Sequence, residues 1–279
     1  MCLQKFPDIS MKREVIDKME GFSILCIAGE NERRIEKAVA REFVLTIILN
    51  NREVATLLCS PADWTYLTAG FLSSEGLLKG LLNSRDEIKK ILVDDQRGVV
   101  HVETSEAKEF IPDASPKRII FSAGGRGATL YSAADTTSQK VESQIKISSD
   151  EVLALVKEFK QRSRTYLATH GVHSAALCGR ENILVFSEDI GRHNALDKVF
   201  GRCLLKGIVT GDRVVITSGR VTSEITQKVA KRAIPIIISI SAPTNLGVSI
   251  AESLGITLVC SVSGRSMDIY TNDWRITRR

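Results

Sequence analysis

The sequence predicts an α/β protein with two lobes, on three observations. The chain has 279 residues, more than one average domain holds. Its C-terminal half alternates short β-branched apolar runs with helical segments, a pattern typical of a parallel sheet covered on both faces. Its N-terminal part reads as strands grouped around one helix. We therefore expect a smaller N-terminal α+β domain over residues 21–110, a mobile inter-domain segment over 111–147, and a three-layer α/β/α domain over 148–279.

The N-terminal lobe is predicted to follow a first stretch of twenty residues that reads as a tail or a peripheral helix. A β-like pattern starts at Gly21. The apolar segments 42–49 and 53–59 flank Asn50-Asn51, which predicts a hairpin closed by an Asn-rich turn. The elements expected next are a helix from near Asp63 to near Gly76, a short charged helix over 84–92 and a strand over 98–103.

The segment between Glu106 and Lys146 lacks core-forming periodicity, so it predicts a mobile connection between the lobes. It contains the run Ala123-Gly124-Gly125-Arg126-Gly127. Three glycines beside an arginine can wrap a phosphate with backbone N–H groups, whereas the pattern alone favours a plain flexible linker. Both interpretations stay open at this point.

The C-terminal lobe is predicted to alternate helices and strands. The expected helices cover residues 149–161, 195–205, 222–233 and 246–254, and the expected strands cover 172–177, 183–186, 214–217, 235–240 and 256–260. Because helices separate the last three strands, those strands should run parallel with right-handed crossovers. The carboxyl ends of such strands meet at one edge of the sheet, where ligands bind.

Composition and charge narrow the class of partner. A formal charge of +5 suits an anionic small ligand or an acidic protein as well as nucleic acid, while 5% aromatic residues argues against a protein that stacks RNA bases or single strands. No apolar run approaches the ~18 residues of a membrane span, and no secretory signal peptide is evident. We expect a cytoplasmic protein with no membrane span and no nucleic-acid partner.

The six cysteines are widely scattered, with no C-x-x-C and no short metal-binding spacing. They read as reduced thiols that mostly fill core positions. These residues are Cys2, Cys26, Cys59, Cys178, Cys203 and Cys260.

Polar residues concentrate at residues 188–198. This segment follows an apolar run that ends at Phe186 and continues into a helical segment that starts at Ala195. Free backbone N–H groups and the helix dipole favour an anion at such a helix N-terminus. The alternative is a capping loop in which Asn194 caps the helix and the charges are solvated. Similar polar corners follow three later strands, and four of them on one edge favour a nucleotide-like anion.

Each later corner offers hydroxyl groups, glycine or arginine directly after a strand. Gly219 permits close approach of the backbone, and Arg220 supplies a planar fork of donors suited to phosphate. Thr222 and Thr244 also fit plain helix N-caps. The candidate cofactor-binding residues are His173, Asp189, Gly191, Arg192, His193, Asn194, Lys198, Ser218, Gly219, Arg220, Ser241, Ala242, Pro243, Thr244, Ser261, Val262, Ser263, Gly264, Arg265 and Ser266.

Three histidines lie near these corners in the sequence. His170, His173 and His193 can be combined with Cys178 or Asp189 as a zinc site, but H-x-x-H on a loop is a weak signal. A hydrogen-bonded structural histidine is the favoured interpretation, so no metal is expected. His193 fits a general acid or base, or a residue that positions a ligand phosphate.

The combination of these segments resembles the FdhD family of formate dehydrogenase accessory proteins. The likeness runs from about residue 24 to Thr271, and Gly191-Arg192-His193-Asn194 is its most specific marker. The segments that carry the likeness are 42–49, 59–63, 69–76, 169–173, 188–198, 218–220 and 241–244.

This resemblance implies a sulfurtransferase. In the family, a cysteine of the inter-lobe loop accepts persulfide sulfur from a cysteine desulfurase and passes it to bis-molybdopterin guanine dinucleotide, which is then inserted into formate dehydrogenase. The resemblance also implies a cytidine-deaminase-like C-terminal lobe, a guanine nucleotide site for which GDP is a partial mimic, and a homodimer. No P-C-x-x-C signature is present, which disfavours deamination.

The sequence departs from the family pattern in the loop. The family carries C-G-x-C-G there, and this chain has Ala123 and Arg126 in place of the two cysteines. Sulfur transfer needs a thiolate, so these two positions cannot carry a persulfide. The last corner also differs, because residues 261–266 lack the family's aromatic residue and keep a single arginine, Arg265.

The resemblance and these residues together suggest three functional interpretations. The first is an accessory protein for formate dehydrogenase maturation that binds the cofactor without the loop thiols. The second is a sulfurtransferase that uses another thiol, Cys260 or else Cys178, although both also fit buried core positions. The third is an unrelated nucleotide-processing enzyme that uses Asp189, His193 and Lys198 as acid, base and phosphate ligand.

Overall fold

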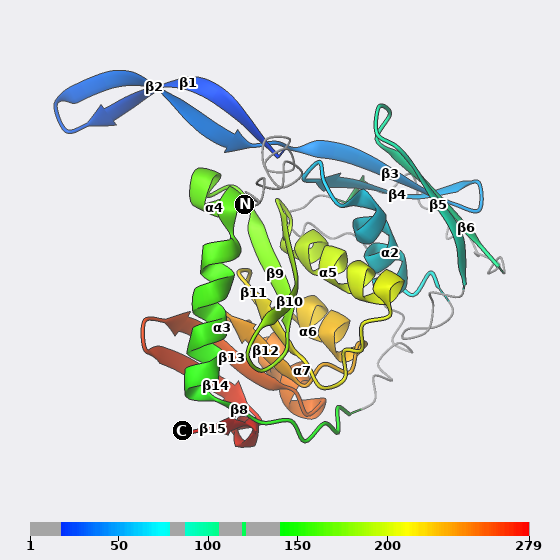
Figure 1. Cartoon of the computed structure of the whole chain (residues 1–279), viewed down its shortest axis with the longest axis vertical. Helices are drawn as coiled ribbons and strands as arrows, with labels where there is room; N and C mark the ends of the chain where they lie inside the picture. Colours follow the sequence, from blue (N-terminus) through cyan, green and yellow to red (C-terminus); the bar gives the residue numbers. More distant parts are fainter. Residues whose placement is uncertain (1–17, 79–86, 106–118, 121–139, 279) are drawn as a thin grey trace, which may run out of the picture.

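The computed structural model of the chain describes residues 18–78, 87–105, 119–120 and 140–278. These residues form two lobes, from which a two-stranded ribbon projects (Figure 1). Most of the predicted N-terminal tail, and the loop that contains Ala123 and Arg126, lie outside the described residues. No helix in the described ranges is long and apolar enough to cross a membrane.

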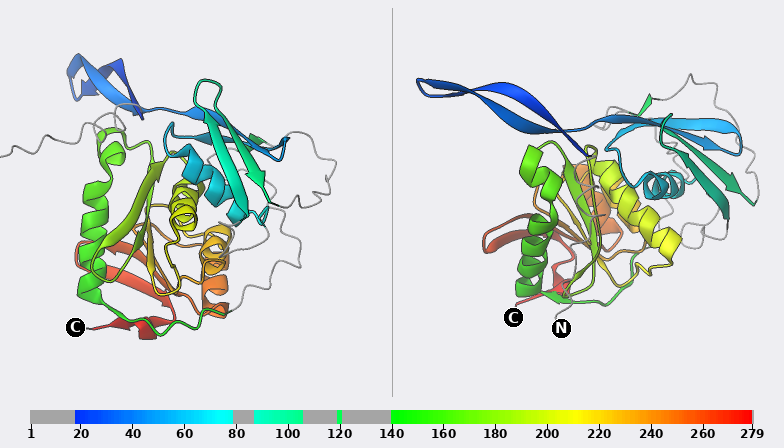
Figure 2. Two further views of the ribbon diagram at one scale, coloured as in Figure 1. Left: turned by 45° about the vertical axis from the view of Figure 1, so that its right-hand side comes forward. Right: turned by 45° about the horizontal axis from the view of Figure 1, so that its top comes forward.

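The ribbon consists of β1 (Met19–Ala28) and β2 (Asn31–Ala40), which pair antiparallel along their whole length. The β pattern predicted from Gly21 is confirmed. Gly29 at the tip has a φ of 63°, a left-handed conformation that glycine adopts easily in a tight turn. Two further views show that the ribbon extends away from both lobes (Figure 2).

The N-terminal lobe is a five-stranded sheet with the order β5-β6-β3-β4-β7, and α2 (Trp64–Ser74) packs against it. Its strands are β3 (Phe43–Leu49), β4 (Arg52–Cys59), β5 (Ile88–Asp94), β6 (Val99–Thr104) and β7 (Ile119–Ile120). Asn50 and Asn51 have φ values of 47° and 64°. Two positive φ angles in succession are the conformation of a tight hairpin turn, so the predicted Asn-rich hairpin is confirmed.

The short charged helix predicted over residues 84–92 is wrong for the part that the structure describes. Ile88 begins the edge strand β5, which pairs antiparallel with β6. The pairing register shifts between Ile88 and Lys90, as at a β-bulge. This bulge turns Ile88 and Ile91 toward the same core, although they lie three residues apart. The spacing therefore imitates one turn of a helix.

The C-terminal lobe is built on a six-stranded sheet with the order β10-β9-β11-β12-β13-β14. Strands β11, β12 and β13 run parallel, as predicted, while β9 is antiparallel to both its neighbours and β14 is antiparallel to β13. The strands are β9 (His173–Cys178), β10 (Ile183–Asp189), β11 (Val214–Thr217), β12 (Ile236–Ser239), β13 (Thr257–Ser263) and β14 (Ser266–Thr271). Because β13 continues past Cys260, the polar segment predicted there is part of a hairpin.

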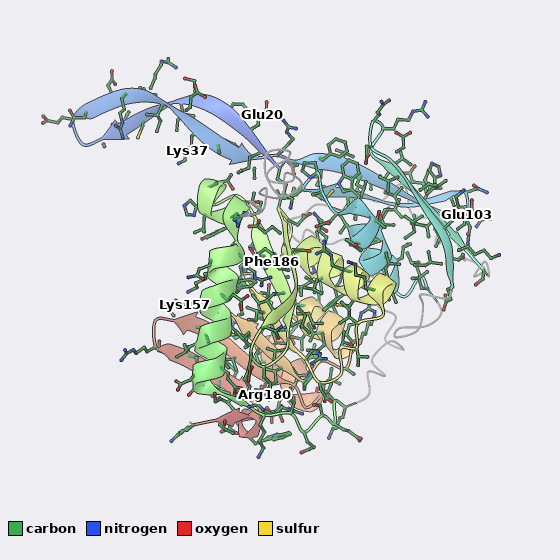
Figure 3. The ribbon with its side chains drawn as sticks, viewed as in Figure 1. Glu20, Lys37, Glu103, Lys157, Arg180 and Phe186 are labelled. Carbon is green, nitrogen blue, oxygen red and sulfur yellow. The ribbon has the colours of Figure 1, made fainter. Side chains whose placement is uncertain are left out.

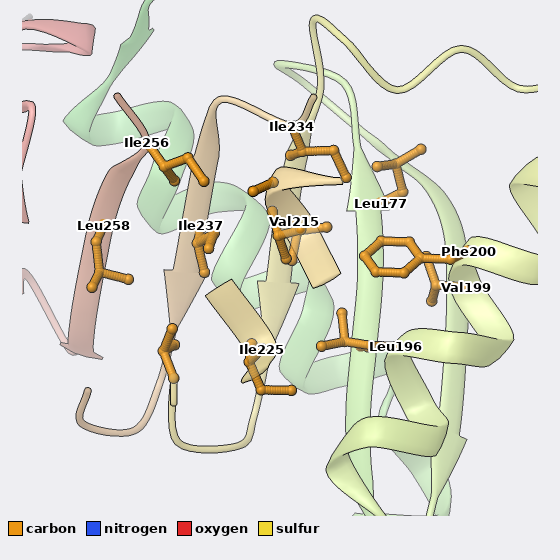
Figure 4. Packing of buried hydrophobic residues seen from close by; sticks show 14 of the residues in the cluster. Leu177, Leu196, Val199, Phe200, Val215, Ile225, Ile234, Ile237, Ile256 and Leu258 are labelled. Atoms are coloured by element: carbon orange, nitrogen blue, oxygen red, sulfur yellow. The ribbon is translucent and has the colours of Figure 1, made fainter. Parts of the chain in front are cut away.

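Helices cover both faces of this sheet, which confirms the three α/β/α layers. α3 (Ser149–Arg162) lies on one face, where its Phe159 ring packs edge-on against the ring of Phe186, with 5.7 Å between the ring centroids. Figure 3 labels Phe186 beside α3. The other face carries α5 (Arg192–Lys206), α6 (Ser223–Ala230) and α7 (Asn245–Ser253). Figure 4 shows that Val215 and Ile237 point into this second layer. Strands buried on both sides thus separate two cores.

Short elements close the C-terminal lobe. They are α4 (Arg164–Thr169), β8 (Ile147–Ser148), the 3₁₀ turn η2 (Asp273–Arg275) and β15 (Ile276–Thr277), which pairs with β8. The buried guanidinium of Arg275 donates to the carbonyl oxygens of Ser143 and Gly255 at 3.0 Å and 2.7 Å. It thereby fixes the chain around Ser143 to the C-terminal sheet.

The two lobes meet where α2 crosses α5. A Cβ atom on Gly70 would overlap the carbonyl oxygen of Asp197, and one on Gly201 would overlap the carbonyl oxygen of Tyr66. The helices approach this closely because both crossing positions lack a side chain. Asp197 then bonds across the junction, since its carboxylate accepts from Ser74 Oγ at 2.7 Å.

We expect Gly201→Ala to lower the free energy of unfolding by about 3 kcal/mol or more, because the added methyl group overpacks the helix crossing. Gly211→Ala is the matched control, since nothing lies within 4 Å of a Cβ atom at Gly211. Chemical denaturation followed by circular dichroism measures both variants. Equal stability of the two would show that the helices do not cross as closely as described.

Candidate functional site

The sheet topology brings four polar segments to one edge of the C-terminal lobe. The parallel strands β11 and β12 end there, β13 passes this edge at Ser261, and β10 ends there beside the first residue of β9. The segments that follow these four strands are the four corners that the sequence analysis singled out. We call this edge the rim and define it as His173, residues 189–194, 218–224 and 239–244, and Ser261.

Hydrogen bonds join the rim segments that follow the parallel strands. Ser239 Oγ donates to the carbonyl oxygen of Gly219 at 2.8 Å. The backbone N–H of Val221 donates to the carbonyl oxygen of Ala242 at 3.2 Å. The backbone N–H of Ser261 donates to the carbonyl oxygen of Ser241 at 3.0 Å. The ends of β11, β12 and β13 therefore form one continuous polar border.

His173 extends this border onto β9. Its Nδ1 lies 3.3 Å from Ser218 Oγ, and the backbone N–H of Ser174 donates to the same oxygen at 2.9 Å. Burial lowers the pKa of His173, and the positive charge of Arg192 lowers it further. A neutral ring that bonds to a serine is a positioning group, not a charged anchor.

Arg192 opens α5 and lies over Gly219. A Cβ atom on Gly219 would stand 2.8 Å from Arg192 Cβ and 3.0 Å from its Cδ, so a larger residue would displace the arginine. Burial lowers the pKa of Arg192, and Arg220 lowers it further, while Glu224 acts in the opposite direction. Two guanidinium groups thus share this part of the rim, and an anion between them would relieve their repulsion.

Three buried polar atoms of the rim have no hydrogen-bond partner among the described residues: Arg192 Nε, His193 Nε2 and Thr222 Oγ1. Such an atom costs roughly 1–3 kcal/mol when it stays unpaired. His193 Nε2 lies 3.4 Å from a carboxylate oxygen of Glu224, but without hydrogen-bonding geometry. The three atoms are therefore unsatisfied donors or acceptors of the rim that have almost no exposed surface.

The two threonines that fit helix N-caps behave differently. Thr244 Oγ1 accepts from the backbone N–H of Gly247 at 3.3 Å and caps α7, so the plain capping interpretation is confirmed for it. Thr222 occupies the same position before α6 but makes no capping bond. Its hydroxyl is buried and unpaired, so it accepts no hydrogen bond from the first backbone N–H groups of α6.

Asp189 and Lys198 form a buried ion pair that faces the N-terminal lobe. Lys198 Nζ lies 2.7 Å from Asp189 Oδ2, and the backbone N–H of Ser60 donates to the same oxygen at 3.0 Å. The backbone N–H of Gly191 donates to Asp189 Oδ1 at 2.9 Å. The anion at the start of α5 is therefore the protein's own carboxylate, and Asp189 and Lys198 are not available to a ligand at the rim.

Asn194 belongs to the same inter-lobe contact. Its Nδ2 donates to the carbonyl oxygen of Leu58 at 2.8 Å and to Asp189 Oδ1 at 2.9 Å. The N-cap of α5 is Gly191, so the predicted capping role of Asn194 is wrong. The physical reason is that the carbonyl oxygen of Leu58, at the end of β4, lies within hydrogen-bond distance of the Asn194 amide, a contact between lobes that sequence spacing does not reveal.

The last predicted corner contributes little to the rim. Ser261 bonds to it, but Val262 is buried in the core beneath α3. Ser266 Oγ donates to the carbonyl oxygen of Ser263, which closes the turn between β13 and β14 on itself. Residues of this turn are exposed, namely Ser263, Gly264, Arg265 and Ser266. The pleat of β13 sends alternate residues to opposite sides, so these candidates do not converge.

Cysteine and histidine placements bear on the remaining interpretations. Cys178 and Cys260 lie in the two cores of the C-terminal lobe, and burial raises the pKa of each thiol to about 12. His170 is exposed at the end of α4. Among the residues that the structure describes, no group of three or more His, Cys, Asp or Glu side chains is arranged to hold a metal ion.

Sequence reasoning missed two rim residues. Glu224, in the first turn of α6, lies 3.4 Å from His193 Nε2, and its charge raises the pKa of Arg192 against the effects of burial and Arg220. Ser239 ends β12 and bridges to Gly219. An acidic residue two positions after a helix start was a usable signal for Glu224, whereas Ser239 reads as part of an apolar strand.

We expect His193→Gln to flatten the pH dependence of stability. Burial, then Lys228 and Arg192, lower the pKa of His193 from 6.5 to about 3 in the folded chain. Between these values the unfolded chain binds the additional proton, so the free energy of unfolding falls as the pH falls through this window. The slope is at most about 1.4 kcal/mol per pH unit. Urea denaturation at a series of pH values between about 7 and about 4.5 measures this slope.

The exposed His170 provides the control for this experiment. His170→Gln should keep the slope of the unsubstituted chain, because it replaces an exposed side chain at the end of α4 and leaves His193 in place. If both variants show the same slope, the neutral buried state of His193 is wrong.

Comparisons with known proteins agree with the fold and with the marker segments. The chain matches the FdhD/NarQ family over residues 40–277. It is 42% identical over 249 residues to the sulfur carrier protein FdhD of Bacillus subtilis, covering 87% of this chain and 92% of that protein. It is 39% identical over 272 residues to the protein of the same name from Bacillus pumilus, covering 97% and 99%.

A solved structure agrees as well. It belongs to a protein from Desulfotalea psychrophila assigned as a formate dehydrogenase accessory protein. It aligns with a TM-score of 0.76 and 27% identity, covering 93% of this chain and 99% of that one. With the family match over residues 40–277, these relatives show that the chain belongs to the FdhD/NarQ family.

Proposed function

We propose that this chain supports formate dehydrogenase maturation by binding the guanine nucleotide ends of bis-molybdopterin guanine dinucleotide at the rim. Family membership supports the link to formate dehydrogenase, since the solved relative is assigned as an accessory protein of that enzyme. The observation that carries the nucleotide part is the set of buried rim atoms without partners, Arg192 Nε, His193 Nε2 and Thr222 Oγ1.

A diphosphate suits this set of donors. Arg192 and Arg220 are close enough to affect each other's charge, and guanidinium groups bind phosphate oxygens through paired N–H donors. The N-terminus of α6 starts beside Thr222 and adds free backbone N–H groups that favour an anion. Gly219 lets Arg192 lie flat against the backbone of the rim. The phosphates would therefore supply hydrogen-bond partners to groups that the protein leaves unpaired.

His193 fits this proposal as a neutral partner. A ring whose pKa lies at about 3 stays uncharged at neutral pH, so it neither donates a proton to a substrate nor attracts phosphate by charge. It can hydrogen-bond to a phosphate or a ribose hydroxyl. Asp189 and Lys198 are bound to each other between the lobes, so they are not available as acid, base or phosphate ligand of a nucleotide-processing enzyme.

The buried cysteines offer no good replacement for the loop thiols. Cys59, Cys178 and Cys260 are buried, and burial raises the pKa of each to about 12. A thiol with such a pKa holds almost no thiolate at neutral pH, and the thiolate is the nucleophile in sulfur transfer. We therefore propose that the chain binds the cofactor for formate dehydrogenase without carrying sulfur on these residues.

We expect GDP to bind the unsubstituted chain and to raise its thermal stability. A ligand with a dissociation constant of ~10 μM stabilises by over ~2 kcal/mol at millimolar concentration. Arg192→Gln should weaken binding by about ten-fold to a hundred-fold, the effect of losing a charge-assisted hydrogen bond. Isothermal titration calorimetry measures the affinity, and Arg265→Gln on the exposed turn should leave it unchanged.

Two further ligands sharpen this experiment. ADP tests whether the base is recognised, and pyrophosphate tests the phosphates alone. Binding of GDP in preference to both supports the guanine nucleotide proposal. Absence of any stabilisation by millimolar GDP, or equal affinity for GDP and pyrophosphate, contradicts it.

We also expect no persulfide on the core cysteines after incubation with a cysteine desulfurase and cysteine, because their buried thiols are not nucleophilic. Intact-mass spectrometry before and after incubation, with and without GDP, measures this. A gain of one sulfur that is lost in Cys260→Ser would establish the sulfurtransferase interpretation, with the desulfurase as a partner. A gain that survives Cys260→Ser directs the search to Cys2 and Cys26.

A further inference from the structure

Helices α5 and α6 lie on the same face of the C-terminal sheet, and two pairs of polar side chains join them (Figure 1). The inner pair is Asp197 of α5 and Lys228 of α6, both buried, with 2.7 Å between Oδ2 and Nζ. The outer pair is His193 and Glu224, with 3.4 Å between Nε2 and Oε2. Residues four positions apart share one face of a helix, so the inner pair fixes the outer pair at the rim.

The two pairs differ in how fully their charges are matched. In the inner pair Lys228 is matched by Asp197 and also lies 3.4 Å from a carboxylate oxygen of Glu75. In the outer pair the ring of His193 is neutral at neutral pH, and its Nε2 makes no hydrogen bond. No other hydrogen bond or ion pair joins the side chain of Glu224 to a described residue. Glu224 is 42% exposed, so its carboxylate keeps unused acceptor capacity at the rim.

A carboxylate is an unfavourable neighbour for phosphate. Arg192 and Arg220 supply the positive charge of the rim, and the negative charge of Glu224 lies near enough to raise the pKa of Arg192. Like charges repel, so phosphates held by the two guanidinium groups would keep away from Glu224. An ionised carboxylate only accepts hydrogen bonds. Glu224 therefore suits a neutral part of a ligand that donates them.

Guanine offers two such donors side by side. Its ring N1–H and its exocyclic N2 amino group point in the same direction and match the two oxygens of one carboxylate. Hydrogen bonds to an ionised group are stronger than those between neutral groups, and a two-point contact adds geometric specificity. Adenine has an acceptor in place of the N1–H, and hypoxanthine lacks the amino group. A site that bonds to an N–H group strongly rejects analogues without it.

We propose that Glu224 determines the base specificity of the rim, with its carboxylate accepting from the N1–H and the N2 amino group of guanine. This inference rests on the proposed binding of a guanine nucleotide at the rim and identifies the group that recognises the base. The neutral ring of His193 leaves the carboxylate oxygens to the base, whereas a cation at position 193 would compete for them. Asp197 and Lys228 position Glu224 without contact to the ligand.

A change in base preference tests this role. Xanthosine diphosphate carries a C2 carbonyl oxygen where GDP carries the amino group, so it repels a carboxylate. The unsubstituted chain should bind GDP about ten-fold to a hundred-fold more tightly than xanthosine diphosphate. Glu224→Gln should reverse this preference, because the glutamine amide donates to the C2 carbonyl oxygen while its own oxygen accepts from N1–H. Isothermal titration calorimetry measures the four affinities.

Three controls separate base recognition from a structural effect. Glu181→Gln alters an exposed glutamate in the turn between β9 and β10, at the end of the sheet opposite to the rim, and should keep the preference for GDP. Pyrophosphate should bind Glu224→Gln at least as tightly as the unsubstituted chain, because a repelling charge is removed. Circular dichroism melting curves show that both variants are folded. An acidic residue in the first turn of α6 also stabilises the helix dipole, but that effect does not distinguish one base from another.

The outcomes distinguish this inference from the proposed function. If the unsubstituted chain does not bind GDP, both are wrong. If it binds GDP and Glu224→Gln still prefers GDP to xanthosine diphosphate, only the role of Glu224 is wrong. An equal loss of affinity for both nucleotides in Glu224→Gln, not shared by 2′-deoxy-GDP, assigns the carboxylate to the ribose and also overturns the inference. Weaker binding of pyrophosphate by Glu224→Gln overturns it as well, because the substitution then disturbs the phosphate groups.

Discussion

The buried ion pair between Asp189 and Lys198 is the contact on which the relation of the two lobes depends. Both side chains are 0% exposed, and neither charge could be tolerated there without full hydrogen bonding. Asp189 accepts from Ser60, Gly191 and Asn194 in addition to Lys198. Removing one partner would leave a buried charge unpaired, which costs about 3–5 kcal/mol. Because Ser60 follows β4, this pair fixes the N-terminal sheet against the start of α5.

Helix α5 transmits this constraint along its length. Asn194, Lys198 and Gly201 recur at helical spacing, and each contacts the N-terminal lobe through a hydrogen bond, an ion pair network or a close backbone approach. Arg192 and His193 lie on the other side of the first turn, over the rim. One helix thus separates the inter-lobe contact from the candidate ligand groups, and the strongly polar segment 188–198 serves both.

Much of the fold follows from the sequence, and the failures have physical causes. The Asn50-Asn51 turn and the parallel strands were predictable because turn chemistry and apolar runs are local properties. The strand β5 was misread because a bulge gives Ile88 and Ile91 a helical spacing. For the site, the predicted ends of the strands located the correct edge of the sheet. Residue type alone does not show whether a polar side chain there faces a ligand or the second lobe. Thr222 and Thr244 have the same type and position, and only geometry separates them.

Periodicity of the polar residues would have resolved part of this ambiguity. Residues 194, 197, 198 and 201 fall on one face of a helix, and a polar face that includes a glycine indicates contact with another element of the chain more than a solvated surface. The residues left over in the first turn, Arg192 and His193, are then the candidates for a ligand. A ligand that binds Arg192 and His193 contacts the first turn of α5. Asp189 holds the same turn by accepting from the backbone N–H of Gly191, so ligand binding at the rim and docking of the lobes both act on α5. Thermodynamic linkage then requires that a ligand which favours the docked arrangement also stabilises the inter-lobe contact.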